Sequence, residues 1–211
     1  PTIANDTYGA NVKLLIRGNG TNGSTNITDD TGKTVTVSGH SQISTAQQKY
    51  GTGSLYFDGT ANTTISVPHS TDFVYGTNDF TIEGWMYFKS FADWTQIMGK
   101  RTGNATATSV LLFNMAAGTI GLYVSNGGWS IAVTNVSGTL SANTWYHVAI
   151  TRSGSTWRAF INGAQTWTTT SSITVNDDGS NVYIGGASNN TYLMNGYIQD
   201  FRITTGVARY G

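Results

Sequence analysis

The acidic residues are the first group in this chain whose chemistry could support a reaction. Glycoside hydrolysis needs two carboxyl groups that face each other across a cleft, about 5 Å apart when configuration is retained. Glu83 is the only glutamate, and no second acid lies two or five residues from it. The pairs Asp29-Asp30 and Asp177-Asp178 stand in polar sequence typical of turns. We therefore expect Glu83 to be a structural hydrogen-bond acceptor and the protein not to be an enzyme.

The other common catalytic motifs are missing. The chain has no Gly-x-Ser-x-Gly nucleophile elbow, no cysteine and no His-Glu-x-x-His zinc motif around His40, His69 or His147. His147 stands among strand-forming residues, which favours a packed, hydrogen-bonded role. Residues 18–23 match Gly-x-Gly-x-x-Gly, but the segment after them is polar and β-prone rather than helical. Dinucleotide binding is therefore not expected.

Four aromatic residues stand in polar surroundings that are typical of loops or sheet edges: Trp94, Trp129, Trp167 and Tyr192. Aromatic rings can hold the apolar C–H face of a sugar while neighbouring amides and hydroxyls bind its OH groups. These four residues are the candidate glycan-binding residues. The alternative is that they cover an interface with another subunit or domain, since interfaces favour the same residue types.

Composition excludes several classes of partner. Only 10% of the residues are charged, the formal net charge is zero, and the basic residues do not cluster beyond Lys100-Arg101. A nucleic-acid binder usually has a basic face, so we expect no nucleic-acid partner. No run of about eighteen apolar residues occurs, which indicates that the chain does not insert into a membrane. The remaining surface is neutral and rich in hydroxyls and amides.

Strand patterns dominate the elements that must position these residues. In residues 80–88 apolar residues alternate over nine positions, with Glu83 and Trp85 on the second face. Asn162-Gly163 is the strongest hairpin signal. The expected strands are 12–16, 34–38, 54–57, 64–67, 80–88, 96–99, 110–115, 119–124, 130–134, 145–152, 156–161, 181–184 and 196–204. Many short strands without helical crossovers predict antiparallel sheets closed as a barrel or packed as a sandwich.

An ordered series of motifs resembles a known family. The motifs are VKLLI at 12–16, GSLYFDG at 53–59, NDFTIEGW at 78–85, NTWYHVAITR at 143–152, FING at 160–163, GYIQDFRI at 196–203 and GVARY at 206–210. The chain resembles the laminin-G-like, concanavalin A-like jelly rolls of phage tail and virion proteins and of bacterial surface proteins. The resemblance covers nearly the whole chain. It implies an all-β, two-sheet antiparallel jelly-roll sandwich that occupies residues 1–211 as a single domain.

The resemblance also implies roles for individual residues. Trp85, Trp145 and Trp157 match core positions. Relatives often hold one structural calcium ion, and Asn19 and Asp200 match its ligand positions. Asn19 replaces a frequent aspartate and Gln199 a frequent second acid, so the site has lost negative charge. A hydrogen bond that caps a turn is the alternative role for Asp200.

The function expected from these observations is recognition without catalysis. The leading hypothesis is a recognition or adhesion module that binds a glycan or cell-surface polysaccharide and stands outside the cell, on a phage virion or a bacterial surface. The alternative is a structural or decoration domain that contacts other virion or surface-protein subunits. The chain begins at Pro1 without Met and stops one residue after the GVARY motif. We therefore expect a domain excised or processed from a longer protein.

Overall fold

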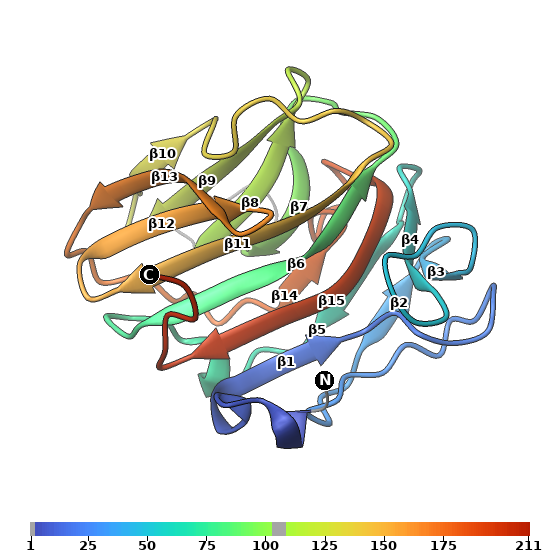
Figure 1. Cartoon of the computed structure of the whole chain (residues 1–211), viewed down its shortest axis with the longest axis horizontal. Coiled ribbons are helices and arrows are strands. Elements are labelled where there is room, and N and C mark those ends of the chain that lie inside the picture. The colour runs from blue at the N-terminus through green and yellow to red at the C-terminus, as the bar shows by residue number, and fades with distance from the viewer. Residues whose placement is uncertain (1–2, 103–108) are drawn as a thin grey trace.

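Two antiparallel sheets packed face to face make up the computed structural model, which describes residues 3–102 and 109–211 (Figure 1). The strands are β1 Val12–Ile16, β2 Thr36–Ser38, β3 Gln42–Ser44, β4 Ser54–Asp58, β5 Thr64–Val67, β6 Phe80–Phe88, β7 Thr95–Lys100, β8 Val110–Met115, β9 Thr119–Ser125, β10 Trp129–Val133, β11 Trp145–Ser153, β12 Thr156–Ile161, β13 Ala164–Thr170, β14 Val182–Ile184 and β15 Asn195–Thr205. Three short 3-10 helices accompany them: η1 Ile3–Asn5, η2 Gly9–Asn11 and η3 Thr71–Phe73. None of the helices in the described residues is long and apolar enough to cross a membrane.

The strand order confirms the predicted two-sheet jelly-roll sandwich. Sheet A has the order β13-β12-β11-β6-β15-β4-β3, and β1 also pairs with β15. Sheet B has the order β10-β9-β8-β7-β14-β5-β2. The expected strands are present with ends that differ by at most two residues. Strand β3 was not predicted, because it is short and mostly polar, and β13 was predicted only as the second arm of a hairpin.

The core lies between the sheets, and β6 shows why the chain folds this way. Phe80, Ile82, Met86 and Phe88 alternate along β6 and are fully or almost fully buried. They pack in one apolar cluster with side chains from both sheets, including the fully buried Trp157. The second face of β6 is therefore the outer face of sheet A. Strand β6 lies in the middle of sheet A, between β11 and β15, as its long apolar pattern predicted.

The predicted Asn162-Gly163 hairpin joins β12 to β13. Both residues have positive φ, 51° for Asn162 and 83° for Gly163. Positive φ at both central positions is the geometry of a type I′ turn, which matches the right-handed twist of the paired strands. The turn places β13 beside β12 as the edge strand of sheet A.

A β-bulge in β15 sets the direction of the side chains that matter below. Gln199 pairs with Trp85 and Arg202 with Glu83, so two residues of β15 face the single residue Gly84. The bulge residue Asp200 has a φ of 51°, while Phe201 stays fully buried in the core. A bulge re-aims side chains without ending the strand. Gln199, Asp200 and Arg202 consequently all reach the outer face.

Candidate functional site

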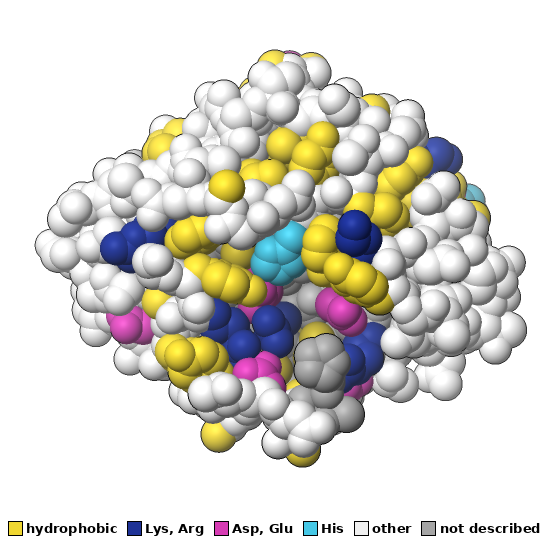
Figure 2. Space-filling model, in the orientation of Figure 1, with side chains coloured by type: hydrophobic (Ala, Val, Ile, Leu, Met, Phe, Trp, Pro, Cys, Tyr) yellow, Lys and Arg dark blue, Asp and Glu magenta, His cyan; other side chains and the backbone are white. Residues whose placement is uncertain are grey.

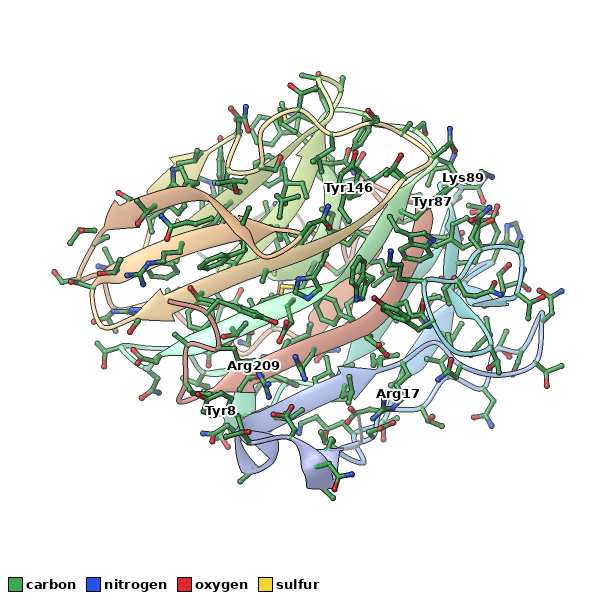
Figure 3. All side chains as sticks on the ribbon, in the orientation of Figure 1. Tyr8, Arg17, Tyr87, Lys89, Tyr146 and Arg209 are labelled. Carbon is green, nitrogen blue, oxygen red and sulfur yellow. The ribbon has the colours of Figure 1, made fainter. Side chains whose placement is uncertain are left out.

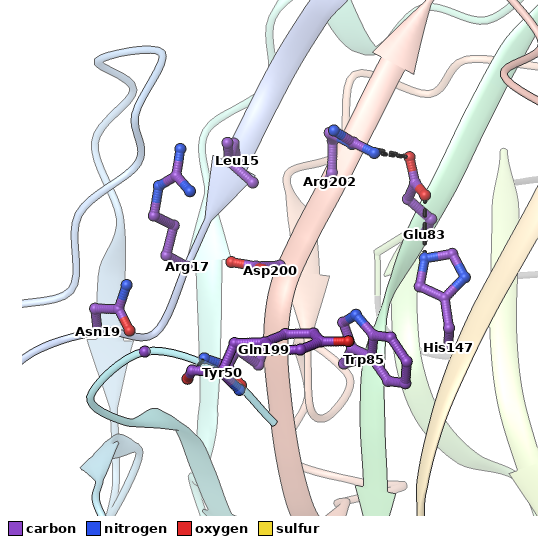
Figure 4. A pocket seen from close by; sticks show the side chains of 11 residues that line it. Leu15, Arg17, Asn19, Tyr50, Glu83, Trp85, His147, Gln199, Asp200 and Arg202 are labelled. Carbon is purple, nitrogen blue, oxygen red and sulfur yellow. Dashed lines mark hydrogen bonds and ion pairs between the residues drawn. The ribbon is translucent and has the colours of Figure 1, made fainter. Parts of the chain in front are cut away.

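A cleft of about 470 Å³ opens on the outer face of sheet A. Strands β1, β6, β11 and β15 supply its floor, and the loop before β4 supplies one wall (Figure 4). Figure 2 shows this hollow, in which charged side chains gather between hydrophobic ones. Its lining residues are Leu15, Arg17, Asn19, Tyr50, Gly51, Glu83, Trp85, His147, Gln199, Asp200 and Arg202.

Glu83 stands at the centre of a buried charge network in the floor. Its Oε1 accepts a hydrogen bond from Nε of Arg202 at 2.8 Å, and its Oε2 accepts one from the Tyr210 hydroxyl at 2.6 Å. Nε2 of His147 lies 3.2 Å from the same Oε2. The Glu83 side chain is only 2% exposed. The predicted role as a structural acceptor is thus consistent with the geometry.

Asp6 extends the network toward the C-terminal tail. Its carboxylate accepts from Arg202 at 2.9 Å and from Arg209 at 2.8 Å. The Arg209 guanidinium also lies 5.3 Å from the ring of Tyr8, and Figure 3 shows these two side chains together. The GVARY motif therefore has a clear structural task, since it folds back over β6 and supplies both Arg209 and Tyr210.

The network holds both acids in their ionised form. Burial alone would raise the pKa of Glu83, but the hydrogen bond from His147, the charge of Arg202 and the Tyr210 hydroxyl together lower this pKa. The hydrogen bond from Arg209 lowers the pKa of Asp6. The Tyr210 hydroxyl, buried and beside Glu83, has its pKa raised. A general acid needs a raised carboxyl pKa to hold a proton near neutral pH, and Glu83 has the opposite shift.

The lowered pKa values of Glu83 and Asp6 predict that the folded domain loses stability in acid. A carboxyl group whose pKa is lower in the folded state stabilises the protein above its unfolded pKa, roughly 4. That stabilisation is lost as the pH falls through the folded pKa. We expect the free energy of unfolding, measured with urea, to fall steadily below about pH 4, as Glu83 and Asp6 become protonated. The variant Asp6→Asn should show a weaker fall; an unchanged slope would contradict the assignment.

Aromatic rings form the wall above this charged floor. The ring of Trp85 contacts Tyr50 edge-on at 5.5 Å between centroids and His147 at 5.3 Å. Nζ of the exposed Lys49 lies 4.7 Å from the Trp85 ring. A second hollow of about 430 Å³ adjoins the cleft, because it shares Trp85 and His147 and adds Lys49, Trp145 and Asn162. The two hollows together make one groove across β6 and β11.

The structure corrects the expectation that Trp85 and Trp145 are core residues. Both are only half-buried and line the groove, whereas Trp157 is fully buried as expected. In a two-layer sandwich each sheet has one covered face, and Trp85 lies on the uncovered face of β6. His147 is hydrogen-bonded as predicted, but its ring lies in the groove rather than in the core.

Gln199 fixes the loop that carries Lys49 and Tyr50. Its Oε1 accepts hydrogen bonds from the backbone N–H groups of Lys49 at 2.8 Å and Tyr50 at 3.1 Å, and its side-chain amide donates to the Tyr50 carbonyl. The amide thus clamps the loop both as an acceptor and as a donor. The clamp holds Tyr50 over the cleft although its ring is 54% exposed.

The two predicted calcium ligands, Asn19 and Asp200, both line the cleft. The Asn19 amide oxygen accepts from the Thr52 N–H at 3.1 Å. Burial raises the pKa of Asp200, and its carboxylate makes no hydrogen bond or ion pair within the described residues, so the turn-capping alternative is not seen there. Calcium favours several carboxylates, and no cluster of three or more acidic or histidine ligands occurs in the described part of the chain. This donor set fits calcium poorly, and the calcium site stays a prediction.

Three of the four predicted glycan-binding residues meet on the other sheet. Trp94, Trp129 and Tyr192 line a smaller hollow of about 190 Å³ together with Arg101, Leu111 and Tyr123. Trp167 lies apart from them on β13, half-buried and packed against the core. Trp167 lines neither the groove nor the hollow of Trp94 and Trp129, and its binding role stays a prediction.

Four residues of the groove were not among the predicted site residues: Tyr50, Trp85, Trp145 and Arg202. A usable signal was present in β6, where Glu83 and Trp85 share the face opposite the apolar one. One face of each sheet must be uncovered in a sandwich, so that polar and aromatic face was the natural place for a ligand.

Comparison with known sequences agrees with this geometry. A sequence profile described as the concanavalin A-like lectin/glucanases superfamily matches residues 58–208, well over half of the chain. The chain belongs to this superfamily. The resemblance seen in the sequence motifs is thereby confirmed. No curated protein sequence matches the chain at a significant level.

Solved structures share the fold of this concanavalin A-like domain. The binding domain of Paraclostridial Mosquitocidal Protein 1 matches with a TM-score of 0.72 and 15% identity, over 95% of this chain and 50% of that one. Domain 4 of AbnA, a GH43 extracellular arabinanase from Geobacillus stearothermophilus solved with arabinotriose, matches with a TM-score of 0.66 and 16% identity, over 93% and 94%. The binding domain of botulinum neurotoxin DC, solved with rat synaptotagmin II, matches with a TM-score of 0.67 and 15% identity, over 94% of this chain and 49% of that one. The chain spans about half the length of the toxin binding domains.

Proposed function

We propose that this concanavalin A-like domain is a non-catalytic recognition module that binds a glycan chain in the groove on the outer face of sheet A. The observation that carries the proposal is the aromatic wall of Tyr50, Trp85 and Trp145 beside polar groups on the same face. Rigid rings offer flat apolar surface to the C–H faces of sugars. Asn19, Asn162 and Asp200 stand next to them as hydrogen-bonding groups for hydroxyls.

The floor of the groove supports binding rather than hydrolysis. Both oxygens of Glu83 accept hydrogen bonds from Arg202 and Tyr210, and its pKa is lowered. Asp200 is the other carboxylate that lines the cleft, on the bulge of the neighbouring strand. A hydrolytic pair needs one carboxyl group that carries a proton and one that is free to attack or to activate water. Glu83 is fixed in ion pairs and suits neither part.

The size of the groove favours a chain of sugars over a single one. The adjoining hollows measure about 470 and 430 Å³, which together exceed the space that one pyranose ring needs. Trp85 lies at their junction, because it lines both. We place the central sugar of the bound chain over Trp85, after the exposed Lys49 side chain has moved aside.

The biological setting belongs to the same proposal. We place the domain outside the cell, on a phage virion or a bacterial surface protein, where it attaches to a host or cell-surface polysaccharide. The motif resemblance to phage and bacterial surface jelly rolls supports this setting. The binding domain of the mosquitocidal protein and the arabinanase domain in complex with arabinotriose, which share the fold, are consistent with this setting.

Trp85→Ala tests the groove directly. Loss of a ring at the centre of a binding site typically costs at least 2 kcal/mol, so we expect affinity for the bound polysaccharide to fall about 30-fold or more. The measurement is a glycan array followed by calorimetry on the best ligand. Tyr183→Ala is the matched control: this half-buried ring lies on the outer face of sheet B, between the core residues Val182 and Ile184, outside the groove and outside the hollow of Trp94 and Trp129, and its loss should leave affinity at the wild-type level. A soluble, folded Trp85→Ala variant with unchanged affinity would contradict the proposal.

The alternative function is a structural or decoration domain that acts through protein contacts. The exposed rings of Tyr8, Tyr50 and Trp94, 37%, 54% and 38% exposed, favour it because interfaces bury such rings. Light scattering at high protein concentration separates the two functions. A stable oligomer that buries Tyr50, combined with a silent glycan array, would favour the structural role.

A further inference from the structure

We propose that the hollow on the outer face of sheet B is a second binding site, which takes a single sugar ring that carries a carboxylate, such as a uronic acid. The proposal concerns the hollow lined by Trp94, Arg101, Leu111, Tyr123, Trp129 and Tyr192, named here the sheet B hollow. It stands independently of the groove on sheet A.

The position of the sheet B hollow separates it from that groove. Leu112 and Leu122 of β8 and β9 point into the core. Their neighbours Leu111 and Tyr123, which pair across these strands, therefore point to the outer face of sheet B. A ligand in this hollow lies on the opposite side of the sandwich from Glu83 and Trp85 and cannot contact them.

Arg101 gives the hollow its charge preference. The residue is only 6% exposed, and burial lowers its pKa. Its Nε donates to Oε1 of Gln96 at 3.0 Å, and its guanidinium lies 5.5 Å from the Tyr192 ring. Among the described residues it has no carboxylate partner, and no acid lines the hollow. A buried guanidinium without a counter-charge is costly unless a ligand supplies the anion.

The guanidinium also selects the kind of anion. Its Nε is engaged by Gln96, so its two terminal nitrogens are the donors left for a ligand. Two parallel N–H donors match the two oxygens of a carboxylate, and this bidentate pairing is stronger and more directional than a lysine contact. A neutral sugar offers no such partner.

The backbone is strained where it presents the two loop aromatics. Trp94 has a φ of 63° and Tyr192 a φ of 56°. The other residues with positive φ, apart from glycines, are Asn62, Asn143, Asn162, Asn190 and Asp200, types that tolerate this region. Bulky aromatic residues adopt this region only at an energetic cost, and such strain concentrates at functional sites. Both strained aromatics in the described chain line this one hollow.

The rings of the hollow are held in place before any ligand binds. Trp94 stacks on Phe113 with centroids 5.0 Å apart, and Tyr123 contacts Trp129 edge-on at 5.1 Å. Phe113 is fully buried, so it anchors the exposed indole. The hollow measures about 190 Å³, less than the roughly 300–1,000 Å³ of sites for drug-sized ligands. Flat rings, one cation and a small volume together fit one acidic pyranose.

The experiment compares two probes that differ at one carbon, sodium glucuronate and glucose. Indole N–H signals of the domain are followed by NMR during titration of each probe into the wild-type protein, Arg101→Gln, Arg101→Lys, and the control Arg158→Gln on the outer face of sheet A. We expect glucuronate to shift the Trp94 and Trp129 signals with saturation and glucose to shift them at least tenfold more weakly. Arg101→Gln should lower the affinity for glucuronate tenfold or more. Arg101→Lys should lower this affinity less, and Arg158→Gln should leave it unchanged.

Other outcomes overturn the inference. An equal response to glucose and glucuronate would remove the charge selectivity, and an equal response to sodium acetate would reduce the site to a simple anion site without sugar recognition. Shifts that depend on protein concentration rather than on probe would identify a self-association surface. Arg101→Lys retains the positive charge, so the test stands if Arg101→Gln fails to fold. The Trp85 indole signal, followed in the same titration, separates this site from the groove, because Trp85 lies on the opposite face of the sandwich and its signal should not follow the Arg101-dependent saturation of Trp94 and Trp129.

Discussion

Replacement of Glu83 by alanine is expected to destabilise the domain by about 3–5 kcal/mol, because Arg202 and Arg209 then have to share the single carboxylate of Asp6 in a largely buried network. The residue is 1% exposed and is bonded to Arg202 and Tyr210, with Arg209 at 3.6 Å. At about 2–4 °C per kcal/mol for a chain of this length, the melting temperature should fall by roughly 6–20 °C. Calorimetry or thermal melting by circular dichroism measures the change.

Two further variants make this prediction specific to the buried network. Asp30→Ala removes the surface ion pair with Arg17, whose atoms lie 2.6 Å apart, and should cost no more than about 1 kcal/mol. Glu83→Gln keeps the shape and one acceptor oxygen, so it should destabilise less than Glu83→Ala. If Glu83→Ala and Asp30→Ala had equal effects, the network would not be the anchor of this face. A hydrolytic activity abolished by Glu83→Gln in a folded protein would overturn the non-catalytic assignment.

Trp157→Ala is expected to cost about 3–5 kcal/mol, through loss of the largest fully buried side chain. The indole Nε1 donates to the Ser171 carbonyl at 3.0 Å, and the ring contacts Phe80 edge-on at 5.5 Å. The substitution leaves a cavity between the sheets and an unpaired carbonyl. Urea denaturation should show a lower midpoint concentration for the variant. At temperatures where the variant stays folded, its affinity for the ligand should be close to that of the wild type.

Trp85→Ala provides the contrast to Trp157→Ala. Its ring is half-buried on the outer face and contacts Tyr50 and His147 rather than the core. Edge contacts of this kind contribute about 0.5–1.5 kcal/mol each, so the loss of stability should be smaller than for Trp157→Ala. Trp157→Ala should therefore lower stability and leave affinity nearly unchanged. Trp85→Ala should lower affinity and have a smaller effect on stability. Equal loss of stability would show that Trp85 is a structural residue.

The two proposed sites differ in whether their charged side chains are paired within the protein. On sheet A, Glu83 and Asp6 are paired with Arg202 and Arg209, so the groove has a fixed, balanced floor and its selectivity comes from the rings above it. On sheet B, Arg101 has no acid beside it among the described residues. A neutral polysaccharide suits the first arrangement and an acidic sugar the second.

The sequence by itself determined the local structure of this protein. Period-two alternation in Phe80–Phe88 predicted the central strand β6, and Asn162-Gly163 predicted the hairpin between β12 and β13. These features depend on side chains only a few residues apart and on the allowed φ of single residues, so they can be read from a short window. The absence of a second acid two or five residues from Glu83 likewise needed only the positions of the acidic residues along the chain, whereas the presence of Asp200 in the same cleft did not follow from them.

Only the tertiary structure decided which residues form a site. Alternation places Glu83 and Trp85 on one face of β6, but it does not say which face the other sheet will cover. That depends on pairings between distant strands, and the core positions that the family resemblance implied for Trp85 and Trp145 were wrong because both rings lie on the uncovered face. Trp94, Trp129 and Tyr192 come from separate loops and strands, and no local pattern relates them to one another or to Arg101. Packing of two sheets fixes these neighbours, because each sheet can bury only one face and its connections bring remote loops to the same edge.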